Sequence, residues 1–337
     1  MGGAPYHERV PYVDRLVTVT LNPAVDRVLE VQRFRIGEHQ PSTLIGGHPA
    51  GKGVNVSRVL AMLGVPSVCT GFVGRGELGM FEEYLERIGQ GRITTQLLVV
   101  RARTRDNITI TDPVDDTETH LRDAGFSVQR EDVLRALSKA SMLSREGAVL
   151  CFCGSLPPGV TRGDLRTMLH RTAESGGLAV VDTGAKVLPA LRCDPMYLAK
   201  LNAEELAAFA DLPTDTFEET VRAARAVVHD PRRQVRNVVA TRGHEGAVFL
   251  NKRIELVGRV FVHPGRIAST VGSGDALLAG LLAVRARGGN WREALRKGLA
   301  VATANAVSRE PGTIGAEDVA EFETAATVEN LESAAPA

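Results

Sequence analysis

Short apolar runs alternate with longer stretches of helical period along most of this sequence. Runs such as LVTVTL (16–21) and AVLCFC (148–153) are rich in β-branched or apolar residues and predict buried strands. The segment VSRVLAMLG (56–64) places apolar residues on one helical face, and further helices are expected at about 130–144 and 291–308. This alternation predicts an α/β domain built on an open sheet.

Two segments depart from the alternation. At about 27–46 and again at about 93–121 the pattern favours short strands with polar interruptions, which predicts a small separate sheet. Residues 1–14 and 325–337 are expected to be a flexible leader and a flexible tail. The remaining residues, 15–324, are then one domain.

A glycine-rich turn stands directly before a long apolar helix in ASTVGSGDALLAGLL. Gly272, Ser273 and Gly274 can leave several N–H groups unpaired where the helix begins, and such a helix start is an anion site. We expect the helix to run from about Asp275 to Ala286. A carboxylate at this junction suits a base that takes a hydroxyl proton while the N–H groups hold a transferring phosphoryl group. The turn alone equally allows Asp275 to be a helix N-cap.

Two cations are candidates for holding a phosphate. Lys52 lies in the glycine-rich segment GGHPAGKGVN (46–55), which leads into a predicted helix. This is not a Walker loop, because Gly53 follows the lysine where Ser or Thr should stand. Arg105 stands at the entry to the second β segment, where it is either solvated surface or a planar fork for a phosphate.

Polar side chains also stand where predicted strands end. Asp26 lies just beyond the first strand, where open α/β sheets bind ligands, although it can instead cap a turn. Asn202 and Glu205 are three apart at a helix start, which suits hydrated Mg²⁺ and equally suits a capping box. The sequence ATRGHEG (240–246) predicts a hairpin turn whose glycines let it lie along a nucleotide.

Two further motifs point to other protein classes. Residues 74–79 fit G-x-G-x-x-G between a strand and a helix, but the acid expected about 20 residues later is missing, so we interpret the glycines as structural. The triplet Asp182-Thr183-Gly184 matches the signature of aspartic proteases. Those enzymes need two such loops, or a short dimerising chain, in a mostly β fold, and this chain has one copy among helices.

Composition narrows the class of partner. The 337 residues are 44% hydrophobic and 24% charged, as in a soluble globular enzyme. Forty basic and forty acidic side chains cancel, so nothing favours nucleic acid or a membrane surface, and a small-molecule partner is expected. No signal peptide or membrane span is evident, which predicts a cytoplasmic location. The four cysteines are expected to be reduced and in or near the core.

The order of the motifs is distinctive. They run NPAVD near 22, AGKGVNVSRVL near 50, TRDNITI near 104, GSLPPG at 154, DTGAKVL at 182, KLNAEEL at 200, ATRGHEG at 240 and VGSGDALLAG at 271. From about Leu16 to Val319 this order resembles the PfkB carbohydrate kinases of the ribokinase-like fold. The NPAVD and HPAGKGVNV segments look most similar to bacterial 1-phosphofructokinases, with tagatose-6-phosphate kinase and a minor 6-phosphofructokinase as close relatives.

The resemblance implies a three-layer α/β/α fold with a small β-sheet lid over the sugar, and commonly a homodimer in which lids pack together. It implies ATP and Mg²⁺ as cofactors, and phosphorylation of fructose 1-phosphate at O6 to give fructose 1,6-bisphosphate. The two related sugar-phosphate kinase activities remain as alternatives. A non-catalytic sensor of sugar phosphates or nucleotides is an alternative of another class.

The resemblance also implies roles by position. Asp275 matches the catalytic base, and the backbone from Gly272 through Ser273 to Gly274 matches the anion hole. The residues that match substrate contacts are Asp26, Gly51 and Asn55 for the sugar hydroxyls, and Lys52 and Arg105 for the phosphate already on the sugar. The residues that match the ATP and Mg²⁺ region are Lys200, Asn202, Glu205, Thr241, Gly243, Gly246 and, near the adenine pocket, Asn305.

Overall fold

The structure is a computed structural model that describes residues 13–308 and 312–331. The strands of its larger sheet are β1 (Arg15–Thr20), β4 (Ser67–Gly74), β5 (Ile93–Val100), β8 (Ala148–Cys153), β9 (Leu178–Asp182), β10 (Met196–Asn202), β11 (Val235–Thr241), β12 (Ala247–Asn251), β13 (Glu255–Arg259) and β14 (Thr327–Asn330). The strands of its smaller sheet, here called the lid, are β2 (Ala24–Glu30), β3 (Thr43–Ala50), β6 (Arg105–Asp112) and β7 (Thr117–Arg122). The helices are α1 (Lys52–Met62), α2 (Leu78–Gly89), α3 (Arg130–Leu143), α4 (Arg162–Glu174), α5 (Ala203–Ala210), α6 (Phe217–His229), α7 (Ser273–Ala286), α8 (Trp291–Val307) and α9 (Ala316–Ala325).

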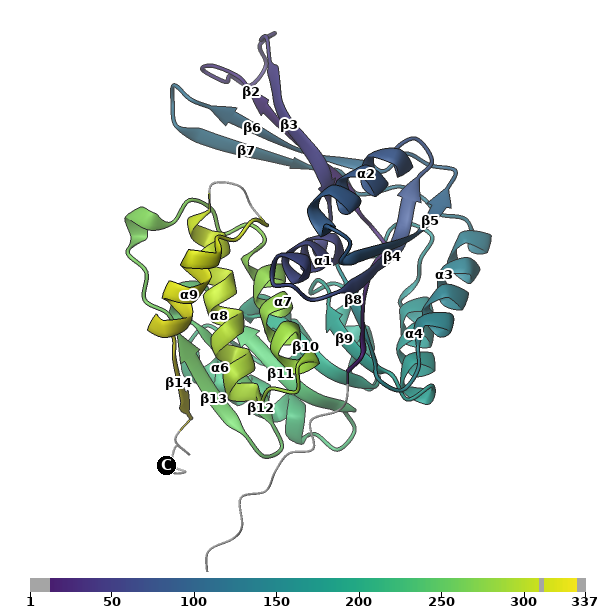
Figure 1. The fold of residues 1–337 in the computed structure, drawn as a ribbon, viewed down its shortest axis with the longest axis vertical. Coiled ribbons are helices and arrows are strands. Elements are labelled where there is room, and N and C mark those ends of the chain that lie inside the picture. Colours follow the sequence, from purple (N-terminus) through teal and green to yellow (C-terminus); the bar gives the residue numbers. More distant parts are fainter. Residues whose placement is uncertain (1–12, 309–311, 332–337) are drawn as a thin grey trace, which may run out of the picture.

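The larger sheet is the centre of the molecule. Its strand order is β14-β13-β12-β11-β10-β9-β8-β1-β4-β5, and the strands from β11 to β5 in this order pair in parallel. Helices cover both of its faces, and the lid projects from one end of the body (Figure 1). The predicted α/β fold with a small separate sheet is therefore present.

Hydrophobic cores lie on both faces of the larger sheet. The core on one face includes side chains from α3, α4, α5 and α6, and the core on the other includes side chains from α1, α7, α8 and α9. Along β8, Leu150 and Phe152 enter the first core while Cys151 and Cys153 enter the second, as the two-residue repeat of a strand requires. None of the described helices is both long and apolar enough to cross a membrane.

The cysteine prediction needs one correction. All four cysteines are free, and three of them are buried, namely Cys69, Cys151 and Cys153. Cys193 is exposed, so the prediction that every cysteine lies in or near the core is wrong there. Its neighbours Leu191 and Asp194 are buried, which shows that the short apolar runs around it do not fix the orientation of each side chain.

The boundaries of the small sheet and of the tail also differ from the prediction. Residues 93–100 pair with β4 in the larger sheet, and the second lid segment begins only at Arg105. β5 is the terminal strand of the larger sheet and is only partly buried. Its sequence therefore has polar interruptions like those of a lid strand. Within the predicted tail, Thr327–Asn330 forms β14 on β13. The predicted leader lies outside the described residues apart from Val13 and Asp14.

α7 and α8 pack closely because two glycines face each other. A Cβ atom placed on Gly280 would lie 2.8 Å from the Cα of Gly298. We therefore expect Gly280→Ala to lower the free energy of unfolding by about 1–3 kcal/mol, measured by urea denaturation. The matched control is Gly79→Ala in α2, where a Cβ meets nothing within 4 Å and the helix should be unchanged or more stable. Equal effects of the two changes would contradict this account of the packing.

Candidate active site

The predicted site residues meet at the carboxyl ends of the parallel strands. Asp182 ends β9, Asn202 ends β10 and Thr241 ends β11, and these three strands are neighbours. α1 begins at the same edge, since Lys52 in its first turn contacts Asp182, and α7 begins beside α1, since Asp275 in its first turn contacts Asn55. Ligands of open α/β sheets bind at this edge.

Asp275 lies inside the first turn of α7 and does not cap it. The helix begins at Ser273, two residues earlier than predicted, and Gly272 is its N-cap with a φ of 78°. The N-cap alternative for Asp275 is therefore wrong. The carboxylate is 6% exposed, and its Oδ2 accepts a hydrogen bond of 2.8 Å from Nδ2 of Asn55.

The environment of Asp275 favours its protonated form more than water does. Burial, reinforced by the negative charge of Asp182, raises the pKa of Asp275 to about 6. The charges of Lys52 and Lys200 and the hydrogen bond from Asn55 act in the opposite direction. A carboxylate with such a pKa is unprotonated at neutral pH and more basic than a solvated one, as a general base requires.

The buried carboxylate of Asp182 contacts both lysines of the site. The sequence reasoning did not place this residue there. Asp182 is fully buried, and its Oδ1 lies 2.7 Å from Nζ of Lys52 and 3.3 Å from Nζ of Lys200. Although burial by itself would raise the pKa of Asp182, the lysine charges hold it below its usual value. The signal in the sequence is an acid directly after the apolar strand LAVV, which we noted in a protease-like triplet and in the family motif DTGAKVL without giving Asp182 a role.

The glycine-rich turn before Asp275 has the form of an anion site. A Cβ atom on Gly274 would lie 2.7 Å from Nζ of Lys200, so glycine at this position lets the ammonium group approach the helix start. Backbone N–H groups at the helix start and a nearby ammonium both favour a negatively charged ligand. The predicted anion hole therefore has an additional cation beside it.

Asn305 on α8 holds this turn by hydrogen bonds from its side-chain amide. Its side chain is fully buried, and Nδ2 donates to the carbonyl of Val271 at 2.8 Å and to Oγ of Ser273 at 3.1 Å. Oδ1 accepts a hydrogen bond of 2.6 Å from the N–H of Gly312. This amide is used within the protein, and the position near the adenine pocket that the resemblance implies stays a prediction.

Asn202 and Glu205 form the capping box that the sequence left open. Asn202 Oδ1 accepts from the N–H of Glu205 at 2.8 Å, and Glu205 Oε2 accepts from the N–H of Asn202 at 2.9 Å. Oε1 of Glu205 lies 3.5 Å from Nζ of Lys52. In the described ranges no three His, Cys, Asp or Glu side chains form a metal cluster. A role of this pair toward Mg²⁺ stays a prediction.

The predicted substrate residues do not form one group. Lys52 contacts Asp182 and Glu205, whereas Arg105 donates to the backbone carbonyls of Pro23, Asn22 and Asp123 at 2.9–3.3 Å. The role of both cations toward the phosphate already on the sugar stays a prediction. Burial alone would lower the pKa of Lys52. The charges of the neighbouring carboxylates outweigh burial and raise this pKa above its usual value.

Asp26 and Gly51 lie where the lid meets the body. Asp26 is on β2, inside the lid and not in a turn, and its Oδ1 accepts a hydrogen bond of 2.7 Å from Nδ2 of Asn107. Gly51 has a φ of 134°, and a Cβ there would lie 2.8 Å from Cγ2 of Thr20. Only glycine fits this close approach at the start of α1.

The predicted hairpin at 240–246 is present. β11 and β12 are antiparallel, and the turn between them contains Gly243 with a φ of 57° and Gly246 with a φ of 100°. A Cβ on Gly246 would lie 2.2 Å from the carbonyl oxygen of Gly258 on β13, so this glycine serves packing. The hydroxyl of Thr241 donates to the carbonyl of Leu201 at 3.4 Å.

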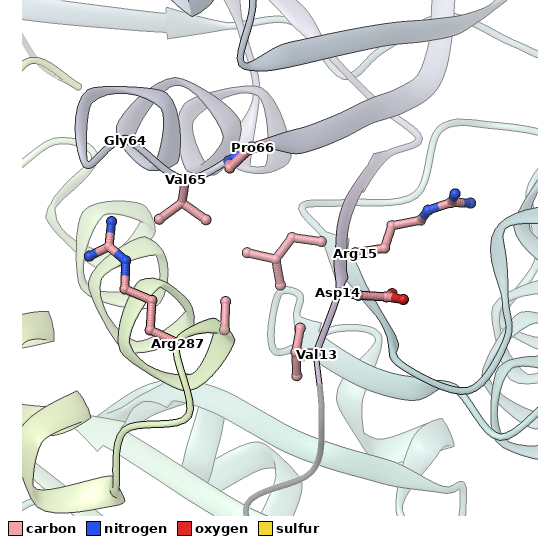
Figure 2. Close-up of a pocket in the computed structure, with 9 residues that line it drawn as sticks. Val13, Asp14, Arg15, Gly64, Val65, Pro66 and Arg287 are labelled. Carbon is pink, nitrogen blue, oxygen red and sulfur yellow. The ribbon is translucent and has the colours of Figure 1, made fainter.

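The cavity drawn in Figure 2 is separate from this site. It has a volume of about 190 Å³ and is lined mainly by residues 13–16 and 64–66, with Ala286 and Arg287 (Figure 2). Gly64 follows the last turn of α1, and Ala286 ends α7. The cavity therefore lies at the opposite ends of the two helices whose first turns carry Lys52 and Asp275.

Comparisons with known proteins agree over nearly the whole chain. The 1-phosphofructokinase of Haemophilus influenzae is 30% identical over 308 residues, which cover 90% of this chain and 94% of that protein. The structure of phosphofructokinase-2 from Escherichia coli in complex with potassium is similar with a TM-score of 0.84 at 21% identity, covering 92% of this chain and 98% of that one. A possible 1-phosphofructokinase from Thermotoga maritima has a TM-score of 0.80 at 27% identity, covering 95% and 100%.

These likenesses confirm the ribokinase-like α/β fold and the family that the motifs indicate. The family model described as pfkB family carbohydrate kinase matches residues 19–318, and the site geometry lies within that range. The chain therefore belongs to the pfkB family of carbohydrate kinases, enzymes that transfer a phosphoryl group from ATP to an alcohol.

Proposed function

We propose that the chain phosphorylates fructose 1-phosphate at O6 with ATP, giving fructose 1,6-bisphosphate and ADP. The observation that carries the proposal is the start of α7, where a buried carboxylate of raised pKa follows the glycine turn that begins the helix. The choice of sugar is supported by the relative named 1-phosphofructokinase, which aligns with most of this chain.

In the proposed mechanism, Asp275 accepts the proton of the sugar O6 hydroxyl. The O6 oxygen then bonds to the γ-phosphorus of ATP as the bond to the bridging oxygen of ADP breaks, so the proton ends on Asp275 and the electron pair on ADP. Asn55 keeps the carboxylate of Asp275 oriented through its 2.8 Å hydrogen bond. The N–H groups of the turn from Gly272 to Gly274 receive the negative charge of the moving phosphoryl group.

The charged residues around the site suit Mg²⁺ and ATP. The three carboxylates of Asp182, Asp275 and Glu205 outnumber the ammonium groups of Lys52 and Lys200. Asn202 and Glu205 would hold the metal through water, since their oxygens already serve the capping box. When bound, Mg²⁺ neutralises charge on the phosphates. We propose that the ATP phosphates lie between Lys200 and the turn, with the hairpin containing Thr241, Gly243 and Gly246 beside the nucleotide.

The lid is the proposed location of the sugar and of the contact between subunits. We propose that Asp26, Gly51 and Asn55 bind sugar hydroxyls and that Lys52 and Arg105 bind the phosphate already on the sugar. The lid also exposes large apolar side chains, which are Ile36, Leu44, Ile45 and Leu121. Burial of such a surface against a second lid would stabilise the proposed homodimer.

The test is ADP release with ATP and Mg²⁺, comparing kcat/KM for fructose 1-phosphate, fructose 6-phosphate, tagatose 6-phosphate and free fructose. We expect a preference of about 10²-fold or more for fructose 1-phosphate, which corresponds to roughly 3 kcal/mol of transition-state binding. A preference for either 6-phosphate would overturn the choice of sugar and keep the base and anion hole. Turnover of none of the four would overturn the proposal.

The pH dependence of kcat/KM should report Asp275. Below about pH 6 the carboxylate is protonated and cannot accept the hydroxyl proton, so kcat/KM should fall tenfold per pH unit. Asn55→Ala removes a hydrogen bond that favours the charged form, so it should raise the pKa and move the acid limb to higher pH. Profiles of both proteins with the preferred sugar check this, and an unmoved limb would show that Asn55 does not set the base's pKa.

A further inference from the structure

Arg58 is a buried cation on α1 that none of the roles above uses. It is 4% exposed and stands three residues after Asn55, so the two side chains leave α1 on the same side. Its Nη2 donates to Oγ1 of Thr313 at 2.5 Å. A Cβ on Gly312 would lie 3.2 Å from Nη1, so the backbone at Gly312 lies directly on the guanidinium group.

From Gly312 the contacts continue to the anion hole. The N–H of Gly312 donates to Asn305, whose amide in turn donates to Val271 and Ser273. A backbone N–H on one side and a backbone carbonyl on the other fix the orientation of this amide. A shift at Gly312 would therefore change hydrogen bonds on the turn that begins α7.

In the other direction Arg58 contacts the lid through one aromatic ring. The guanidinium carbon lies 5.8 Å from the centre of the Tyr84 ring on α2. The same ring stacks with that of His48 on β3, with a centroid separation of 5.8 Å and an interplanar angle of 21°. β3 is a lid strand, so a continuous set of contacts joins the lid to the anion hole.

We propose that Arg58 is a positioning residue that holds the turn from Gly272 to Gly274 in its catalytic geometry, and that packing of the lid on Tyr84 reinforces this hold. The proposal rests on the proposed role of that turn as the anion hole. In this proposal Arg58 contacts neither the sugar nor ATP, and it acts through Gly312 and Asn305. α1 then positions both parts of the reaction, the base through Asn55 and the anion hole through Arg58.

A second buried arginine provides a matched control. Arg285 is 2% exposed, lies 4.3 Å from the Trp291 ring and donates to Tyr197 and to the carbonyl of Gly289. It stands in the last turn of α7, at the end opposite to Asp275. Arg285→Met therefore removes a similar buried cation without a link to the turn, and it should change stability alone.

The experiment measures binding of Mg²⁺ and ADP by calorimetry with and without aluminium fluoride, a mimic of the moving phosphoryl group. In the wild-type protein and in Arg285→Met, aluminium fluoride should tighten ADP binding. In Arg58→Met we expect about tenfold or greater loss of this tightening, with ADP binding alone changed less than about twofold. If Arg58→Met does not fold, Thr313→Val breaks the same link by removing one hydroxyl, and a partial loss is expected.

Each other outcome would overturn a different assignment. Tightening that survives in both Arg58→Met and Thr313→Val overturns the role of Arg58 while leaving the anion hole in place. An equal loss of tightening in Arg285→Met would show that the effect comes from general destabilisation of the fold. Absence of tightening in the wild-type protein would overturn the anion-hole assignment itself. Turnover with the preferred sugar separates this last case from a failure of the proposed function.

The link to the lid has its own readout. His48→Ala and Arg58→Met should each lower kcat, and the double variant should lose less than the product of the two single effects, because both changes interrupt the same contacts. The pair His48→Ala and Arg285→Met should be multiplicative. Multiplicative effects in both pairs would overturn the part of the proposal that concerns the lid.

Discussion

Replacing Asp275 by Asn is expected to lower kcat by on the order of 10²-fold or more while making the protein more stable. Activity falls because the amide cannot accept the hydroxyl proton. Stability rises because the folded protein holds the carboxylate at a pKa of about 6, against an ordinary 3.8, so its ionised form is disfavoured by folding. An Asn can keep the hydrogen bond from Asn55 without the buried charge.

The sign of the stability effect depends on pH. Above about pH 6 the wild-type carboxylate is ionised in both states, and Asn should add about 1–3 kcal/mol to the free energy of unfolding. Below about pH 4 the carboxyl group is protonated in both states, so the difference should vanish. Thermal unfolding at pH 8 and pH 4 and single-turnover kinetics check both parts. Near-wild-type turnover would refute the assignment of Asp275 as the base.

Replacing Asp182 by Asn is expected to destabilise the protein by about 3–5 kcal/mol, since it leaves Lys52 and Lys200 side by side without their carboxylate. Loss of the negative charge of Asp182 should also lower the pKa of Asp275. The acid limb of kcat/KM should therefore move to lower pH, opposite to the shift in Asn55→Ala. Turnover should fall as well, because the two ammonium groups are no longer held in place.

A matched control separates stability from tuning of the base. Asp194 is also buried, at 1% exposure, and its carboxylate contacts Arg166 and His170 on α4. Asp194→Asn should cost stability yet leave the acid limb where it is. Urea unfolding and pH profiles of the two variants provide the comparison. If both variants shift the limb, or neither does, the pKa of Asp275 is not governed by Asp182.

The parts of the site that follow from local sequence were predictable. The turn before α7, the strand β8 and the hairpin at 240–246 each depend on neighbouring residues, and all three are present. The edge strand β5 could not be distinguished from a lid strand, because partial burial gives both the same pattern. β14 was missed since its four residues contain one buried side chain, Val328.

The partners of the site residues could not be predicted from the sequence. Lys52 meets Asp182 across 130 positions of the chain, and Asn55 meets Asp275 across 220. Such pairs depend on strand order, which a single sequence does not specify. The shared phosphate site expected for Lys52 and Arg105 came from the family resemblance, and in the fold the two side chains have different protein partners.

The position of β1 has a consequence for how the chain reaches this structure. The first strand of the sequence lies inside the larger sheet, with β4 on one side and β8 on the other. Arg15 of β1 pairs with Ala148 of β8. During synthesis on a ribosome, one edge of β1 therefore stays unpaired until more than a hundred further residues have emerged. Closure of so long a loop slows folding. The pairing of β1 with β8 joins the strands β4 and β5 to the rest of the sheet and completes the edge on which the site is assembled.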